Sequence, residues 1–294
     1  MQTWMLFTLL AVLMQSVRTA GQKQIANRLS IEATTLVRFL FGLPFAAAYC
    51  LSLFWRDGQV AFAPGAAFFT SSSLAAVAQI AATFCLVRAL TIKNFAVGTA
   101  LAKTEAIMTA LLGTLFFSAS LSLSGYLSVV IGVAGVLVAS QWRFSWRDLY
   151  ENESIKFGLG AGIGFALASL WIRDASLSLA ISPLISSSLV LFYMVALQTL
   201  ICLVWVMWRD SRQIELIKEN LQASLFIGFT SVAGSVGWFT AMSLQEAALV
   251  KTLGQLEFVV TLLITYLYFG ERISAREYFG ILLVAVSIGL LLAN

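Results

Sequence analysis

Long apolar segments separated by short polar ones run the whole length of this sequence. Each is about as long as the roughly 20 residues that a helix needs to cross a bilayer. The approximate boundaries of the ten segments are 3–22, 33–54, 66–89, 94–117, 123–140, 157–176, 183–208, 222–243, 246–269 and 275–293. The longest polar stretches are 141–156 and 209–220. The pattern predicts an all-α integral membrane protein with ten transmembrane helices.

Composition supports this prediction and excludes much chemistry. Hydrophobic residues make up 60% of the 294 residues and charged residues 11%, against about 45–50% and 25% in soluble proteins. There is no histidine, and Cys50, Cys85 and Cys202 lie in apolar stretches. We therefore expect no catalytic triad, no metal site and no cofactor. The net charge of +4 is spread over loops, so no nucleic-acid partner is expected.

The two halves of the sequence align when one is shifted along the other. Matched pairs are Glu105 with Glu257 and Ser122 with Ser274 at a shift of 152, and Arg18 with Arg173 at a shift of 155. Charged residues that match inside apolar segments indicate duplication rather than chance. The first apolar segment then has a counterpart in the second half, so we expect it to be retained rather than cleaved as a signal peptide.

The duplication predicts how the chain is organised. Residues 1–140 form one five-helix repeat, 141–156 a connecting loop and 157–294 a second five-helix repeat. Because five is odd, the second repeat must insert upside down relative to the first. Many secondary transporters have such inverted repeats, with a site near the midplane between them. Two repeats in one chain remove the need to dimerise, so a monomer is the simplest expectation.

Three short motifs carry a resemblance to a known family. They are Val37-Arg38-Phe39-Leu40, Arg88-Ala89-Leu90-Thr91 and Tyr268-Phe269-Gly270-Glu271-Arg272-Ile273-Ser274. In their order and spacing they resemble the drug/metabolite transporter superfamily, in its ten-helix branch with two EamA-type domains. The resemblance covers nearly the whole chain. It implies a permease that exports or exchanges small organic solutes such as amino acids, metabolites or drugs.

The chain also departs from that family. The turn at 117–122 lacks the Glu-Arg of its counterpart in the second half. Many members have proline in the fourth and ninth helices where this chain has Glu105 and Glu257. The sequence therefore leaves open whether these helices kink, and a carboxylate pair could have taken over the position.

Glu105 and Glu257 are the first candidates for a functional site. An ionisable residue inside a membrane helix is costly unless it is paired or hydrated, so it usually faces a cavity or a partner. Glu105 shares a small, polar helical face with Thr109, and Glu257 shares one with Thr261, because residues four apart lie on the same side of a helix. Either the two faces line a common site or each glutamate only bonds a neighbouring helix. If they share a site, their mutual repulsion predicts that one of them carries a coupling proton.

Other polar side chains could belong to the same site. Lys251 could face the cavity or snorkel to the membrane surface, whereas Lys103 is off the face of Glu105, which favours snorkelling. Gln79 belongs to a polar stripe in the third segment and Trp238 to one in the eighth. Either stripe could line a cavity or serve packing between helices.

The matched arginines Arg18 and Arg173 could bind an anionic substrate group such as a carboxylate. Because both lie near segment ends, they could equally be interface anchors. For Arg38 the sequence favours snorkelling or a structural ion pair.

These features predict a secondary transporter of a small organic solute, which works by alternating access around a cavity between the repeats. We expect it to be a multi-pass protein of a bacterial inner membrane, surrounded by lipid. A membrane partner subunit without transport activity is the alternative. An integral-membrane enzyme is disfavoured, because a nucleophile with a base is missing and the four aspartates lie near segment ends. The positive-inside rule would put both termini outside, whereas the resemblance favours the cytoplasm, and that question stays open.

Overall fold

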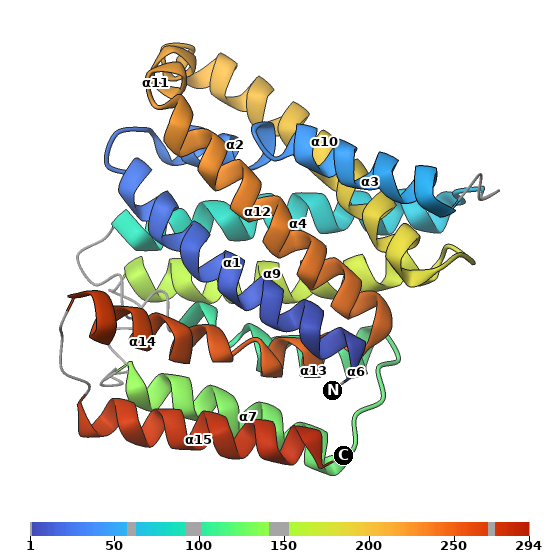
Figure 1. Ribbon diagram of the computed structural model, residues 1–294, viewed down its shortest axis with the longest axis vertical. Helices are drawn as coiled ribbons and strands as arrows, with labels where there is room; N and C mark the ends of the chain where they lie inside the picture. Colours follow the sequence, from blue (N-terminus) through green and yellow to red (C-terminus); the bar gives the residue numbers. More distant parts are fainter. Residues whose placement is uncertain (1, 58–62, 92–100, 141–152, 270–273, 294) are drawn as a thin grey trace.

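The computed structural model describes residues 2–57, 63–91, 101–140, 153–269 and 274–293, without the side chains of residues 57, 90, 261 and 264–269. Within these ranges the regular structure is entirely helical (Figure 1). The first half contains α1 (Thr3–Ile25), α2 (Ile31–Leu40), α3 (Leu43–Asp57), α4 (Ala66–Thr91), α6 (Glu105–Phe116) and α7 (Leu123–Ala139). The second contains α9 (Glu153–Leu177), α10 (Pro183–Asp210), α11 (Gln213–Glu219), α12 (Leu221–Leu244), α13 (Ala247–Leu253), α14 (Leu256–Phe269) and α15 (Ala275–Leu292).

The apolar segments of the sequence coincide with these helices. In the described residues, seven helices are long and apolar enough to cross a membrane, with α2 and α3 together counted as one. The helices α6 and α7 are apolar but shorter, with 12 and 17 residues. The segment expected at 246–269 is divided into α13 and α14. The start of the segment at 94–117 and most of the loop at 141–156 lie outside the described residues.

The two halves are interleaved rather than set side by side. The first helix of each half packs along the third apolar segment of the other half: α1 lies against α12, and α9 against α4 (Figure 1). Small residues allow these helices to approach closely. A Cβ atom added at Gly237 of α12 would lie 2.4 Å from the carbonyl oxygen of Phe7, and one at Gly164 of α9 would lie 2.9 Å from Cβ of Ala82. The exchange of partners is what a two-fold relation between the halves requires.

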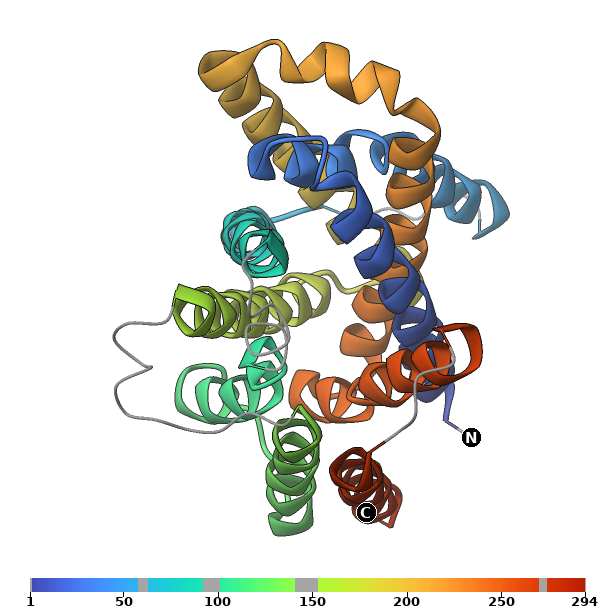
Figure 2. The same cartoon turned by 90° about the vertical axis from the view of Figure 1, so that its left-hand side faces the viewer.

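The last helices of the two halves, α7 and α15, form a pair at one edge of the molecule (Figure 2). Ser287 Oγ donates a hydrogen bond of 2.7 Å to the carbonyl oxygen of Ser128. Further along, Gly280 lies against Ala139. Residue numbers rise along α7 as they fall along α15, so the repeat-related helices are antiparallel. The second half is therefore inverted relative to the first.

Both halves contain a helix break at the same place. The helical turn that contains Ala102 is separated from α6 by Lys103 and Thr104, and α13 is separated from α14 by Gly254 and Gln255. Ala102 and Gly254 are equivalent at the shift of 152. The chain therefore breaks these helices without proline, which answers the question that the sequence left open.

The ends of α7 and α15 also repeat. Ser122 caps α7 by accepting a hydrogen bond from the backbone of Gly125. Ser274 caps α15 and forms the capping box with Glu277 that the sequence suggests; a capping box satisfies two of the free backbone donors at a helix start. Most of the motif at 268–274 lies outside the described residues.

Large apolar side chains are exposed on the outer faces of the helices. Leu13 of α1, Leu51 of α3 and Phe229 of α12 are all more than 45% exposed. Polar side chains such as Gln22 and Gln198 are instead fully buried. Since lipid rather than water suits an apolar outer surface, the fold is that of an integral, multi-pass membrane protein.

Candidate functional site

The two helix breaks bring the candidate glutamates together. Glu105 is the first residue of α6, and Glu257 is the second residue of α14. Free backbone N–H groups and the helix dipole favour a negative charge at these helix starts. Thr109, predicted to share the face of Glu105, donates its hydroxyl to the backbone carbonyl of Glu105 at 2.7 Å. The carboxylates therefore sit at two matching helix starts, one in each half.

Each glutamate forms an ion pair with a lysine of the other half. Lys103 Nζ lies 2.5 Å from Glu257 Oε2, and Lys251 Nζ is in contact with Glu105 Oε1. The pairs are thus crossed: the lysine at each break meets the glutamate at the other. This arrangement neutralises both carboxylates and ties the two broken helices to each other.

Gln15 of α1 and Trp238 of α12 complete the cluster. Gln15 Nε2 donates to Glu257 Oε2 at 2.7 Å, while Gln15 Oε1 accepts from Trp238 Nε1 at 2.9 Å. The ammonium of Lys251 lies 4.3 Å from the centre of the Trp238 ring, which is a cation–π arrangement. Gly254 is required here, because a Cβ atom at that position would lie 2.4 Å from Cη2 of Trp238.

A small cavity of about 20 Å³ lies among these side chains. Its lining consists of Gln15, Lys103, Glu105, Trp238, Lys251, Gly254, Gln255 and Glu257. This volume has room for about one water molecule. The charged side chains therefore fill most of the space between them, and residues of α1, α12 and both helix breaks surround it.

Lys103 is the residue that sequence reasoning placed wrongly. On a continuous helix it would point away from Glu105, which is why snorkelling was favoured. Because the helix breaks at Lys103, its side chain reaches Glu257 instead. A signal was available in the repeat. The equivalent of Lys103 is Gln255, which is also a polar residue two positions before a glutamate, and both line the cavity.

The repeat-related arginines lie in different surroundings. Arg18 is 3% exposed, and its charge interacts with those of Glu105 and Glu257. Arg173 of α9 instead contacts the end of α12 and the turn before α13. Its guanidinium donates to the carbonyl oxygens of Met242 and Gln245 and pairs with Glu246, each at 2.8 Å. The structure brings Arg18 close to the charged cluster and places Arg173 in a separate backbone contact.

Gln79 lies outside the cluster. Gln79 accepts a hydrogen bond of 2.8 Å from Gln198 Nε2, between α4 and α10. The side chain of Thr261 is outside the described residues. Arg38, for which snorkelling or an ion pair was expected, is 4% exposed and donates to Ser231 at 3.0 Å and Thr83 at 2.6 Å.

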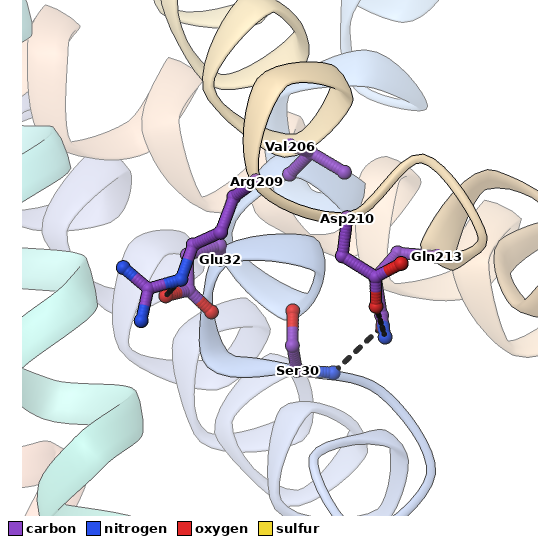
Figure 3. A pocket seen from close by; sticks show the side chains of 6 residues that line it. All are labelled: Ser30, Glu32, Val206, Arg209, Asp210 and Gln213. Atoms are coloured by element: carbon purple, nitrogen blue, oxygen red, sulfur yellow. Dashed lines mark hydrogen bonds and ion pairs between the residues drawn. The ribbon is translucent and has the colours of Figure 1, made fainter.

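A larger cavity of about 310 Å³ lies elsewhere, where α2 begins and α10 ends (Figure 3). It is lined by Ser30, Glu32, Val206, Arg209, Asp210 and Gln213. Its polar groups bond one another: Arg209 pairs with Glu32 at 3.2 Å, and Gln213 bonds both Asp210 and the backbone of Ser30. Despite its size it is not where the interior charges converge, so the small cavity is the better candidate.

The fold and the site define a class: a helical membrane protein built as an inverted repeat, with paired charges at its two broken helices. A family model matches residues 2–141 and again residues 152–293, and its description is the EamA-like transporter family. The chain belongs to this family and is a drug/metabolite transporter superfamily protein with two EamA-type domains. Members of this family are transporters, which agrees with the expectation that the chain is not an enzyme.

Structures extend the likeness in fold. A solved crystal structure, described only as that of a protein, superposes with a TM-score of 0.76 over 98% of this chain and 95% of its own, at 12% sequence identity. In all, 29 chains of solved structures match. No curated protein sequence matches this chain.

Proposed function

We propose that this protein is a secondary transporter that exports or exchanges a small organic solute, such as an amino acid or metabolite. In this proposal it works by alternating access around the charged cluster between its halves. The observation that carries the proposal is the crossed pairing, in which Lys103 meets Glu257 and Lys251 meets Glu105. Ion pairs that join two inverted halves at matching helix breaks can be exchanged when the halves move.

The energetics of the cluster suit such an exchange. Buried ion pairs contribute little net stability, because desolvation offsets the attraction between the charges. A solute whose own charged groups replace one member of a pair can therefore open the cluster at small cost. Discontinuous helices at the midplane are the usual place for solute and ion sites in inverted-repeat transporters.

The energy source follows from what the sequence contains. It has no Gly-x-x-x-x-Gly-Lys-Ser/Thr motif for nucleotide binding, so an ion gradient or an exchanged solute would drive transport. In this proposal the coupling ion is a proton, because each of the crossed pairs contains a carboxylate, Glu105 or Glu257. The same proposal places the protein as a monomer in the lipid of a bacterial inner membrane.

Reconstitution tests this function directly. The purified protein is placed in proteoliposomes, and uptake of a panel of radiolabelled amino acids and organic acids is measured with and without a pH gradient. At least one member of the panel should accumulate when the gradient is present. Glu105→Gln or Glu257→Gln should lose gradient-driven accumulation while solute still binds. Arg88→Gln, which removes an exposed pair with Glu153 at 3.6 Å and a contact with the ring of Phe157, is the matched control and should behave as wild type.

The outcomes separate the two parts of the proposal. If both glutamine variants accumulate solute with wild-type pH dependence, the glutamates do not couple protons. If the wild-type protein moves no member of the panel under either gradient or exchange conditions, the transporter function is wrong.

A further inference from the structure

Two buried arginines form no ion pair with a carboxylate in the part of the chain that the structure describes. Arg18 and Arg38 are 3% and 4% exposed. Neither forms an ion pair with any residue that the structure describes, and the two described glutamates nearest to Arg18 are already paired with lysines. A buried charge without a partner is strongly unfavourable. Their retention therefore calls for a ligand of opposite charge.

The two guanidinium groups belong to one region of the interior. α1 and α12 run antiparallel, since Gly237 lies against Phe7 and Gly21 lies against Ile227. Ser231, to which Arg38 donates, falls between these two contacts and hence at about the level of Arg18. The like charges of Arg18 and Arg38 interact, so each makes the other less favourable in the absence of an anion.

The polar groups around the arginines leave hydrogen-bonding capacity unused. Arg38 has only two hydroxyl acceptors among the described residues, Ser231 and Thr83. Nε of Arg18 is buried and has no hydrogen-bond partner in the described part of the chain. One turn further along α1, the amide nitrogen and oxygen of Gln22 are also buried and have no hydrogen-bond partner among the described residues. Since buried polar groups are nearly always bonded, these donors and the Gln22 amide oxygen are available to a ligand.

The charges in the described part of the interior point the same way. Among the described residues, Lys103 and Lys251 pair with Glu257 and Glu105, which leaves the positive charges of Arg18 and Arg38 without a carboxylate in an ion pair. Guanidinium groups bind carboxylates in a bidentate, planar geometry. The crossed pairs nearby supply carboxylates and ammonium groups that could bind a second polar group of the same solute.

We propose that Arg18 and Arg38 bind the anionic group of the transported solute, and that this solute is a small organic carboxylate. The assignment rests on the proposed transport function and adds the class of substrate. It replaces the pairing of Arg18 with its repeat partner Arg173, whose guanidinium is already bonded to backbone and to Glu246. The transporter thus uses an arginine outside the repeat relation, because the equivalent of Arg38 at the shift of 152 is Val190.

Binding to the purified, full-length protein in nanodiscs tests the assignment. The probes are succinate and L-glutamate, with succinamide as the uncharged analogue, putrescine as the cation and glycerol 3-phosphate as a phosphate. Wild-type protein should bind a carboxylate at least tenfold more tightly than succinamide or putrescine. Arg18→Gln and Arg38→Gln should each lower that preference at least tenfold, and Arg→Lys should restore part of it, because lysine keeps the charge but not the fork.

Arg173→Gln is the matched control, since it removes a guanidinium that is bonded elsewhere, and it should keep the preference. If Arg18 and Arg38 were only structural, their substitution would weaken the binding of all probes equally and leave the preference for carboxylates unchanged. That result would overturn the assignment. Equal binding of succinate, succinamide and putrescine by the wild type would also overturn it, as would selective binding of the phosphate alone. Uptake measured in proteoliposomes distinguishes a failure of the carboxylate assignment from a failure of the transport function. A neutral or cationic solute that is transported equally well by the arginine variants would leave the transport function standing and reject the carboxylate.

Discussion

Two of the ion pairs that join the halves of this protein lie in opposite surroundings. In the interior, Lys251 and Glu105 have side chains that are 9% and 15% exposed. Where α10 ends beside the start of α2, Arg209 pairs with Glu32 at 3.2 Å, but its side chain is 65% exposed (Figure 3). The bond types are the same, whereas the solvent around them differs.

The difference in solvent exposure indicates which of the two regions has a functional role. A pair at the surface costs little to form and contributes roughly 0–1 kcal/mol. An interior pair carries a large desolvation cost, and apolar residues of similar size would often be at least as stable. Stability alone therefore does not explain four charges at the helix breaks, and the solute site that we propose gives them a purpose.

Removing one interior partner should have the largest effect on stability. Glu105→Ala leaves the ammonium of Lys251 buried beside Trp238 without its carboxylate. We expect a loss of about 3–5 kcal/mol, measured as a lower midpoint of thermal unfolding in detergent.

The double variant Glu105→Ala with Lys251→Ala is the control, because it removes both charges. It should be more stable than Glu105→Ala alone, which a double-mutant cycle would show as a coupling between the two sites. If the loss in the double variant equals the sum of the losses in Glu105→Ala and Lys251→Ala, the two charges do not depend on each other.

Substitution of Arg173, the repeat partner of Arg18, should have an effect on stability between those of the interior pair and the exposed pair. Arg173→Gln removes two bonds to backbone carbonyls and an ion pair with Glu246. Since hydrogen bonds from charged groups contribute about 1.5–3 kcal/mol, we expect Arg173→Gln to cost roughly 2 kcal/mol in the same unfolding assay, with transport unchanged. Arg18→Gln should do the reverse, with weaker solute binding and little loss of stability. If Arg173→Gln instead abolished binding at wild-type stability, its role would be the one that we assign to Arg18.

The sequence predicts most of the fold, because two strong signals act together. Membrane helices follow from hydropathy, and the inverted arrangement follows from a duplication with five segments in each half. The antiparallel packing of Ser287 on Ser128 is the kind of contact that this symmetry requires. The helix breaks were harder to predict, since they occur without proline at Lys103–Thr104 and Gly254–Gln255.

The candidate site was predicted less completely, for the same reason. Helical periodicity identifies Glu105 and Glu257 as facing a common interior, but it assigns Lys103 to the wrong side because it assumes an unbroken helix. Repeat symmetry likewise suggests equal roles for Arg18 and Arg173. Duplication preserves the position of a residue along its helix, whereas its partners depend on how each half has diverged, and Arg38 has no charged counterpart at all.

The exposed pair should give the smallest effect. Arg209→Gln removes the charge that faces Glu32, but the arginine is largely in solvent, so the loss should stay below about 1 kcal/mol. Salt gives the sharper measurement. At roughly 1 M salt, where charges are screened beyond about 3 Å, Arg209→Gln and wild type should unfold at the same temperature. The interior pair is shielded from ions, so the deficit of Glu105→Ala should persist at that salt concentration. If salt removed both deficits equally, the interior cluster would be as accessible to ions as the surface, and the contrast between the two regions would be wrong.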